Sequence, residues 1–428
     1  MYETTRGGAA VSLHEAVFRG LGADGGLYAP VRLPRLPEAS WGVPASPEAR
    51  SLHDAARWAA PFFFPSLDPE LLGRVVDRSL DFPVEIVEVG PKLFVLELFH
   101  GPTGAFKDVG ARFMAALMPE LADARSQHTV LVATSGDTGG AVASAFHNVP
   151  GYRVVVLFPR RGISERQRRQ MTTLGGNVTA LSVAGTFDDC QKMVKSAFAD
   201  AGLSATHGLT SANSINIARL LPQAFYYVLT ALRLGPVHFV VPSGNLGNLC
   251  AGLLAAHAGM PTMGFTAATN ANRGFVDFLN GAPFEPRPSV PTAASAMDVG
   301  APSNLERIRW LFRGDEHALR AEVHGEVVSD EEAFERIRTV EKNSGYVMDP
   351  HTAVAYGAAM RGREAHGATQ VILSTAHPAK FPETVEAAIG RRVSVPDGVR
   401  AQAAAPEYLL EIDPTEEALA KALEGIRF

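Results

Sequence analysis

The chain has 428 residues, 46% of them hydrophobic and 20% charged, which is typical of a soluble globular protein of two or three domains. Its 45 acidic and 39 basic residues give a formal net charge of −6, and this balance argues against a nucleic-acid partner. Cys190 and Cys250 lie far apart without metal-ligand spacing, so we expect two buried thiols rather than a disulfide or a structural zinc site.

The N-terminal segment lacks a basic stretch followed by an apolar stretch, so no signal peptide is predicted. No run of 18 or more apolar residues occurs, which predicts neither a membrane-spanning helix nor a membrane partner. We therefore expect a cytoplasmic protein.

Residues 1–88 are predicted to form an N-terminal layer on the main body. Prolines punctuate this region, and a helical pattern between Leu52 and Leu80 is interrupted at Pro61 and Pro65.

From about residue 92 onward, short apolar runs alternate with amphipathic segments. Because the apolar runs are continuous, we expect parallel strands in sheets covered on both faces, which defines an α/β protein built from βαβ units. The predicted strands cover residues 92–99, 129–134, 152–158, 178–183, 237–241, 263–268 and 370–374. The predicted helices cover residues 107–118, 141–147, 163–173, 187–201, 215–234, 246–258, 330–343, 352–363 and 383–389.

Prolines refine these boundaries. One helix is predicted to end before Pro119, another is predicted to kink at Pro222, and a turn is expected at residues 349–351. Residues 281–303 are rich in proline and alanine and are predicted to be a long loop.

The first segment that carries chemistry is HGPTGAFKD, residues 100–108, between a predicted strand and a predicted helix. It places Lys107 at a helix start, where the positive end of the helix dipole disfavours a protonated amine. Burial acts in the same direction, and a lysine that forms a Schiff base needs such a lowered pKa. Taken alone, the segment also fits a surface lysine on an amphipathic helix.

A Gly-rich turn, TSGDTGG, occupies residues 134–140 between a buried strand and a helix. Its backbone N–H groups offer an anion site at the helix N-terminus. Ser135, Asp137 and Thr138 are also good N-cap residues, so a capped turn without a ligand is equally compatible with this segment.

A second turn of this kind, PSGNLGN, occupies residues 242–248. Gly244 and Gly247 allow a ligand to approach the backbone closely, and successive N–H groups can cradle a phosphate. The segment lacks the lysine of a P-loop and the GxGxxG pattern of dinucleotide sites. An ordinary Gly-rich connection is the competing interpretation.

Residues 211–219, SANSINIAR, gather Asn213, Ser214 and Asn216 at a helix start and place Arg219 farther along. A guanidinium with amide and hydroxyl groups suits a phosphoryl or carboxylate group. Simple capping with a surface arginine is the alternative.

The segment LSTAHPAKF, residues 373–381, ends a buried strand. It places Thr375 at the carboxyl end of the strand, where ligands collect in open α/β sheets, although a plain strand-end turn has the same pattern. No HExxH, GxSxG or kinase pattern occurs and no metal-binding histidine pair is present, so no metal is expected.

In this order and spacing, these segments resemble the β-family, or fold type II, of pyridoxal-phosphate (PLP) enzymes. More narrowly, they resemble threonine synthases of the long bacterial and fungal type. The resemblance covers about residues 13–382. Further matching segments are GLG at residues 20–22, GGLY at 25–28, ATNAN at 268–272, SAMDV at 295–299 and DPHTAVAY at 349–356.

The resemblance implies two open parallel-sheet α/β domains of the tryptophan synthase β type, with the N-terminal layer added. A large PLP-binding domain is expected to comprise residues 89–130 and 205–428, and a small mobile domain residues 131–204. The oligomeric state stays open between a monomer and a homodimer.

The resemblance also implies roles for single residues. Lys107 matches the lysine that holds PLP as a Schiff base and then acts as acid and base, and Thr375 matches the hydroxyl residue near the pyridine nitrogen. The loop that holds the cofactor phosphate corresponds to Gly244, Asn245, Leu246, Gly247 and Asn248.

On the substrate side, Ser135 and Thr138 match the loop that receives the carboxylate. Asn213, Ser214 and Arg219 match the groups that hold the substrate phosphate.

Two positions depart from the wider family. Asp137 stands where many relatives have Asn beside the 3′-oxygen of the cofactor, although long-type threonine synthases often have Asp. Asn248 stands where relatives often have Asp, and a role for its backbone N–H tolerates that change.

The implied reaction converts O-phospho-L-homoserine and water to L-threonine and phosphate, the last step of threonine biosynthesis. Two alternatives remain from the sequence. One is a related dehydratase or phospho-lyase that releases a 2-oxo acid, and the other is a PLP-binding protein without catalysis.

Overall fold

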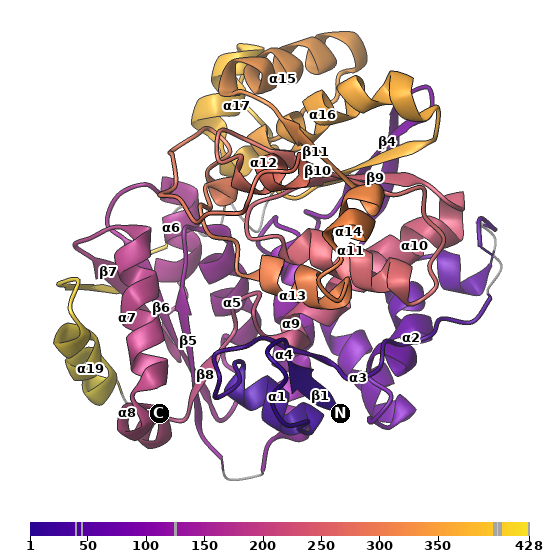
Figure 1. The fold of residues 1–428 in the computed structure, drawn as a ribbon. Coiled ribbons are helices and arrows are strands. Elements are labelled where there is room, and N and C mark those ends of the chain that lie inside the picture. Colours follow the sequence, from indigo (N-terminus) through magenta and orange to yellow (C-terminus); the bar gives the residue numbers. More distant parts are fainter. Residues whose placement is uncertain (39–40, 44–45, 124–125, 397–399, 401–404, 427–428) are drawn as a thin grey trace.

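The computed structural model describes residues 1–38, 41–43, 46–123, 126–396, 400 and 405–426. Two open β-sheets form its two halves, and helices cover both faces of each sheet (Figure 1). The larger sheet has the strand order β11-β10-β9-β12-β4-β3, and the smaller sheet has the order β13-β7-β6-β5-β8. The predicted α/β class is confirmed.

The neighbouring strands of both sheets run parallel, except for β3, which pairs with β4 in the antiparallel direction. The larger sheet consists of β3 (Glu85–Gly90), β4 (Leu93–Glu97), β9 (His238–Pro242), β10 (Phe265–Thr269), β11 (Val323–Val327) and β12 (Gln370–Ser374). The smaller sheet consists of β5 (His128–Ala133), β6 (Tyr152–Pro159), β7 (Val178–Val183), β8 (Leu209–Ser211) and β13 (Leu409–Ile412).

Strand β12 shows why the apolar runs of the sequence are continuous. Val371 and Leu373 belong to the main core, which also contains residues of α10 (Ala224–Leu234) and α11 (Gly247–His257). Ile372 belongs to a separate cluster with α16 (Pro350–His366). Figure 1 shows α16 above this sheet and α10 and α11 below it, so both faces of the strand are covered.

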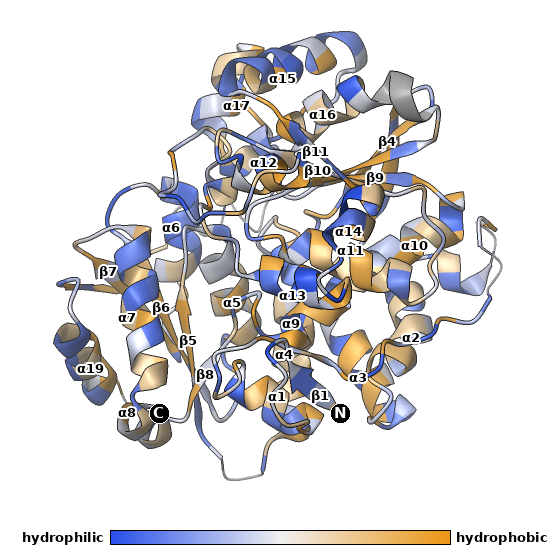
Figure 2. Ribbon diagram, in the orientation of Figure 1, coloured by the Kyte–Doolittle hydropathy of each residue, from blue (hydrophilic) through white to orange (hydrophobic). Residues whose placement is uncertain are grey.

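The smaller sheet is covered in the same way. Val156 of β6 belongs to the main core on the side of α5 (Asp137–Phe146), whereas Val155 packs with α7 (Phe187–Ala199) and α19 (Glu416–Gly425). Cys190 and Cys250 are buried free thiols, as expected. In Figure 2 the strands of both sheets are mostly orange, and blue polar residues lie on outward-facing helices such as α7 and α15 (Asp330–Ser344).

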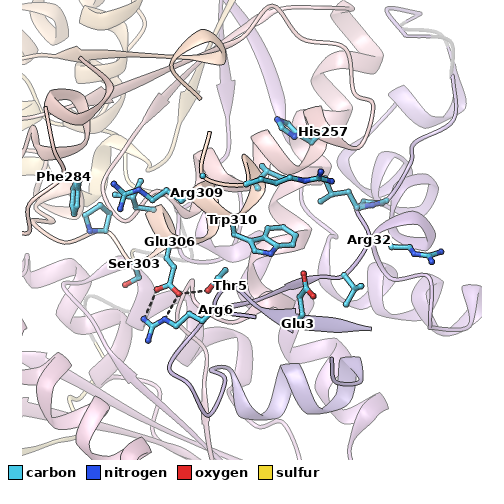
Figure 3. Close-up of a pocket in the computed structure, with 18 of the residues that line it drawn as sticks. Glu3, Thr5, Arg6, Arg32, His257, Phe284, Ser303, Glu306, Arg309 and Trp310 are labelled. Carbon is cyan, nitrogen blue, oxygen red and sulfur yellow. Dashed lines mark hydrogen bonds and ion pairs between the residues drawn. The ribbon is translucent and has the colours of Figure 1, made fainter. Parts of the chain in front are cut away.

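The N-terminal layer packs against the larger half. Its strands β1 (Tyr2–Thr4) and β2 (Tyr28–Pro30) form an antiparallel pair. Thr5 and Arg6, just after β1, both donate to Oε1 of Glu306, at 2.6 and 2.9 Å (Figure 3). These contacts tie the start of the chain to α13 (Asn304–Leu311).

The remaining helices connect or cover the sheets. They are α1 (Leu13–Arg19), α2 (Leu52–Phe63), α3 (Pro69–Ser79), α4 (Lys107–Leu121), α6 (Glu165–Thr172), α8 (Ala201–His207), α9 (Ile217–Leu220), α12 (Gly274–Leu279), α13 (Asn304–Leu311), α14 (Glu316–Glu322), α15 (Asp330–Ser344) and α17 (Pro382–Ile389). Short 3₁₀ turns cover Pro47–Ala49, Leu221–Gln223, Ser295–Met297 and Pro378–Lys380. No helix in the described ranges combines the length and apolarity needed to cross a bilayer.

Of the helix boundaries predicted from prolines, one is confirmed and two differ in the structure. The interruption at Pro222 is confirmed, since a 3₁₀ turn separates α9 from α10. The predicted end before Pro119 is wrong, because α4 continues to Leu121 and loses only one hydrogen bond in its last turn. The expected turn at residues 349–351 is instead the start of α16, where Asp349 is the N-cap and Pro350 is the first helical residue.

Strands β8 and β13 belong to the smaller sheet, whereas the domain boundaries predicted from the sequence place them in the large domain. Those boundaries put residues 205–428 in the large domain, yet β8 and β13 pair with β5 and β7 of the smaller sheet. Residues 131–204 alone therefore do not complete that sheet.

Candidate active site

A cavity of about 1810 Å³ opens between the two sheets, beside the carboxyl ends of β5, β8, β9 and β12. Ligands collect at this edge in open α/β sheets. Every residue singled out from the sequence as a site residue lines this cavity: Lys107, Ser135, Asp137, Thr138, Asn213, Ser214, Arg219, Gly244, Asn245, Leu246, Gly247, Asn248 and Thr375.

Lys107 is the first residue of α4, and its side chain is 17% exposed. Its Nζ atom lies 3.8 Å from Oδ2 of Asp137. Burial lowers the pKa of Lys107 to about 8; Asp137 opposes this shift, and the positive charges of Arg219 and Lys380 add to it. A minority of this amine is therefore neutral near pH 7, a much larger share than for an ordinary lysine with a pKa of 10.5.

Asp137 is the first residue of α5 and is buried. Its Oδ1 atom accepts a hydrogen bond from Nε2 of Gln167 at 2.9 Å and lies 3.0 Å from Nζ of Lys380. Burial raises the pKa of this carboxyl, but Lys380 and Lys107 outweigh burial and hold the pKa of Asp137 well below its usual range. The side chain is therefore a carboxylate.

The turn between β9 and α11 is held by neighbours on two sides. Nδ2 of Asn245 donates to Oγ of Ser214 at 2.9 Å, and Nδ2 of Asn304 donates to the same oxygen at 3.1 Å. A Cβ atom on Gly244 would lie 2.9 Å from Cα of Met297, so only glycine fits there. Within the described part of the chain no side chain caps the N-terminus of α11, which leaves its first N–H groups for an anion.

Asn248 has a fixed orientation. Its Oδ1 atom accepts hydrogen bonds from the hydroxyl groups of Tyr226 at 2.6 Å and Tyr227 at 2.8 Å. Its Nδ2 atom is buried and has no hydrogen-bond partner among the described residues. The two tyrosines thus determine that the amide nitrogen is the group left for another ligand.

Arg219 and Asn213 also carry buried polar atoms without a partner in the described part of the chain, namely Nε of Arg219 and Oδ1 of Asn213. Arg219 is 3% exposed, and Nη1 donates to the carbonyl oxygen of Ala212 at 2.5 Å. Burial lowers the pKa of Arg219 to about 10, which still leaves it charged at neutral pH. A buried guanidinium with a free donor suits an anionic ligand.

Thr375 and the Ser135 turn complete the wall. The carbonyl oxygen of Thr375 accepts from the backbone N–H of Phe106 at 2.9 Å, so the end of β12 supports the turn before Lys107. Oγ1 of Thr134 accepts from the N–H groups of Gly136 and Gly139, both at 2.9 Å. The hydroxyl-bearing residues Ser135 and Thr138 line the cavity on this turn.

A group of hydrogen-bonded residues around Asp298 lies beside the cavity, and the sequence assigned no role to it. Oδ1 of Asp298 accepts from Nδ2 of Asn270 at 2.8 Å and Nδ2 of Asn272 at 3.0 Å. The backbone N–H of Ala296 donates to Nε2 of His351 at 3.1 Å. These contacts join the ATNAN, SAMDV and DPHTAVAY segments, so the matching motifs were the signal that pointed to them.

Lys380, Gln167 and Gln170 were also missed. Lys380 belongs to the LSTAHPAKF segment, in which only Thr375 was singled out. The two glutamines had no distinguishing signal, because polar residues on a predicted helix are usually solvated.

A second cavity, of about 1390 Å³, lies between the N-terminal layer and α13 (Figure 3). It shares Arg6, Ala301, Ser303 and Glu306 with the first cavity, and none of the site residues predicted from the sequence lines it. The Arg6–Glu306 ion pair thus stands between the two cavities.

Three family models match the chain. They are described as pyridoxal-phosphate dependent enzyme over residues 84–376, threonine synthase N terminus over residues 1–79, and threonine synthase, C-terminal, over residues 352–423.

Curated relatives cover nearly the whole chain. Threonine synthase from Serratia marcescens is 39% identical over 421 residues, covering 97% of both chains. Threonine synthase from Escherichia coli is 41% identical over 404 residues, covering 92% of both chains.

Solved structures agree over the full length. The crystal structure of threonine synthase from Escherichia coli superposes with a TM-score of 0.90 at 37% identity, covering 100% of each chain. The PLP-bound threonine synthase from Brucella melitensis superposes with a TM-score of 0.89 at 33% identity, covering 100% of this chain and 99% of the other.

Proposed function

The chain belongs to the threonine synthase family of PLP-dependent enzymes, and from this premise we propose that Lys107 is its catalytic residue in converting O-phospho-L-homoserine and water to L-threonine and phosphate. The observation that carries this proposal is the pairing of two buried groups in one cavity. These are a lysine with a lowered pKa and an arginine, Arg219, with a free donor.

The cavity contains hydrogen-bond donors without a partner among the described residues, and their positions suit PLP. The uncapped N-terminus of α11 and the Gly244–Asn248 turn suit the cofactor phosphate, and the orphaned Nδ2 of Asn248 offers a further donor. Lys107 would hold the cofactor aldehyde, and Thr375 would face the pyridine nitrogen. When bound, PLP supplies an electron sink for a carbanion at the substrate α-carbon.

Lys107 would move protons at the α- and β-carbons of the substrate. Its pKa of about 8 lets the same amine accept a proton and return it near neutral pH. The carboxylate of Asp137, 3.8 Å away, stabilises the protonated form without a direct hydrogen bond.

The remaining predicted residues would bind the two anionic ends of the substrate. Arg219, Asn213 and Ser214 would hold the substrate phosphate, and the orphaned Nε of Arg219 supports this role. Ser135 and Thr138, with the N–H groups at the start of α5, would receive the carboxylate.

We also propose that a small domain closes over the substrate and excludes water until it is needed. Residues 131–204 form most of this domain in our proposal, and β8, β13 and α19 are added because they complete the smaller sheet and its cover.

The test is to supply the purified protein with PLP and O-phospho-L-homoserine and to measure three products together. Threonine and phosphate in equal amounts support the proposal. Phosphate with 2-oxobutyrate would assign a phospho-lyase instead, and bound PLP without any product would assign a non-catalytic binding protein.

A further inference from the structure

A second lysine lies buried behind the cavity. Lys380 ends the 3₁₀ turn after β12 and has no exposed surface. Its Nζ atom donates to the carbonyl oxygen of Thr103 and to Oε1 of Gln170, both at 2.8 Å, and lies 3.0 Å from Oδ1 of Asp137. An ammonium group has three donors, so all three are used.

Asp137 stands between two lysines. Oδ1 faces Lys380 and accepts from Gln167, whereas Oδ2 lies 3.8 Å from Nζ of Lys107. The side of the carboxylate that faces Lys107 is thus determined by the partners on its other side.

The network connects the two halves of the molecule. Thr103 lies in the turn just before Lys107, and Lys380 follows the larger sheet, whereas Asp137 and Gln170 lie on α5 and α6 beside the smaller sheet. Nε2 of Gln170 also donates to the carbonyl oxygen of Thr103, at 2.9 Å. A buried, fully bonded ion pair of this kind is costly to break from one side, because the other charge is left without its partner.

We propose that Lys380 is a positioning residue that holds the Asp137 carboxylate at a distance from Lys107 that is too long for a direct hydrogen bond, and so sets the protonation of the nitrogen that links Lys107 to the cofactor. This inference rests on the proposed role of Lys107. It adds a residue that touches neither substrate nor cofactor but acts through Asp137.

The charges around Lys107 give the direction of the effect. Asp137 and Asp108 raise the pKa of the Lys107 amine, whereas Arg219 and Lys380 lower it. The charged groups that face Asp137 are Lys380, Lys107 and His351. Removing the charge of Lys380 therefore relieves repulsion at Lys107 and leaves Lys107 as the nearer cationic partner of Asp137, and both changes favour the protonated nitrogen.

The experiment is a pH titration of the visible absorbance of the holoenzyme, without turnover. In K380M we expect the midpoint for loss of the protonated form to rise by about one pH unit, and in D137N to fall by about as much. K380R keeps the charge and should restore the wild-type midpoint. A wild-type midpoint in K380M overturns the proposal.

Gln170→Leu is the matched control, because it removes a hydrogen-bond partner of Lys380 without changing any charge. We expect lower thermal stability and an unchanged midpoint, and a shift as large as that of K380M would reduce Lys380 to a structural role. If K380M does not fold, the test rests on D137N. A wild-type pH midpoint in D137N then overturns the proposal. Borohydride reduction and peptide mass spectrometry separately test whether the cofactor is attached at Lys107, so failure of the proposed function is recognised independently.

Discussion

The Nζ atom of Lys107 lies 3.8 Å from Oδ2 of Asp137, close enough for charge attraction but too far for a direct hydrogen bond. The protonated amine is therefore held near its counter-charge without a direct hydrogen bond to it. This relationship underlies the first two predictions.

Replacing Lys107 with alanine is expected to abolish both the visible absorbance of lysine-bound PLP and threonine production, because the attachment point and the proton carrier are the same atom. Absorbance spectra and a threonine assay of the purified variant measure the two effects. The control is Lys342→Ala, which alters an exposed lysine of α15. Normal threonine production by Lys107→Ala would refute the assignment.

The apoprotein should become more stable when Lys107 is replaced with methionine. The folded-state pKa of about 8 lies below the ordinary value of 10.5, so the unfolded chain binds more protons between pH 8 and 10.5 and wild-type stability rises with pH across this window. Below pH 8 the full cost of the buried amine is present, so Lys107→Met should gain about 3 kcal/mol at pH 7. The gain should vanish above pH 10.5. Urea unfolding of both apoproteins at several pH values measures it, and a gain that does not vary with pH would show that the buried charge of Lys107 is not its cause.

Arg219→Ala should raise the KM for the phosphorylated substrate roughly 10- to 100-fold, the usual loss for a hydrogen bond to a charged group. Arg219→Lys should recover part of this loss, because it keeps the charge but not the planar set of donors. Steady-state kinetics measure both variants. Arg74→Ala on α3, half exposed, serves as the control. An unchanged KM would remove Arg219 from the phosphate site.

Gly244→Ala should weaken PLP binding at least about tenfold, because the added Cβ would overpack the turn, at a typical cost of about 1–3 kcal/mol. The new atom would lie 2.9 Å from Cα of Met297 and 3.0 Å from the carbonyl oxygen of Ala296, and both are backbone atoms that cannot turn away. Gly425→Ala is the matched control, since no atom of the described residues lies within 4 Å of its added Cβ. Equal PLP affinity in the two variants, measured by fluorescence titration, would contradict this steric argument.

Asp298→Ala should loosen the segment 289–303 without altering α11. The substitution leaves Asn270, Asn272 and Thr292 without their shared acceptor, at a cost of about 1–3 kcal/mol. Hydrogen–deuterium exchange should speed up in this segment, and PLP affinity should fall because Met297 packs over Gly244. The control is Glu335→Ala, which alters an exposed acid on α15 and should change neither the exchange rate nor the PLP affinity. If segment 289–303 of Asp298→Ala exchanged no faster than in the wild type, the hydrogen bonds of Asp298 would not be what holds this segment.

Features that depend only on residues close together in the chain were predicted from the sequence. The apolar run at residues 370–374 and the Gly-rich turn at residues 242–248 are complete within a few residues, so the strand and the turn follow from them. The predicted site residues were brought to one cavity because the carboxyl ends of parallel strands share an edge.

Contacts between residues far apart in the chain could not be predicted from the sequence. The ion pair of Asp137 and Lys380 joins residues far apart in the chain, and neither one signals the other. The polar residue Gln170 gave no sign that it would be buried and bonded to Lys380. Strand β13 was missed because its alternating burial is weak and its partner, β7, lies in the distant smaller sheet.

The place of β13 has a consequence for the newly synthesised chain. Strands β5 to β8 leave the ribosome early, but the strand that pairs with β7 comes only at residues 409–412. Until then β7 presents an open row of backbone groups, the kind of edge along which unfinished chains associate with one another. Pairing with β13 covers this edge, so we expect deletion of residues 409–412, none of which lines the cavity, to lower the yield of soluble protein.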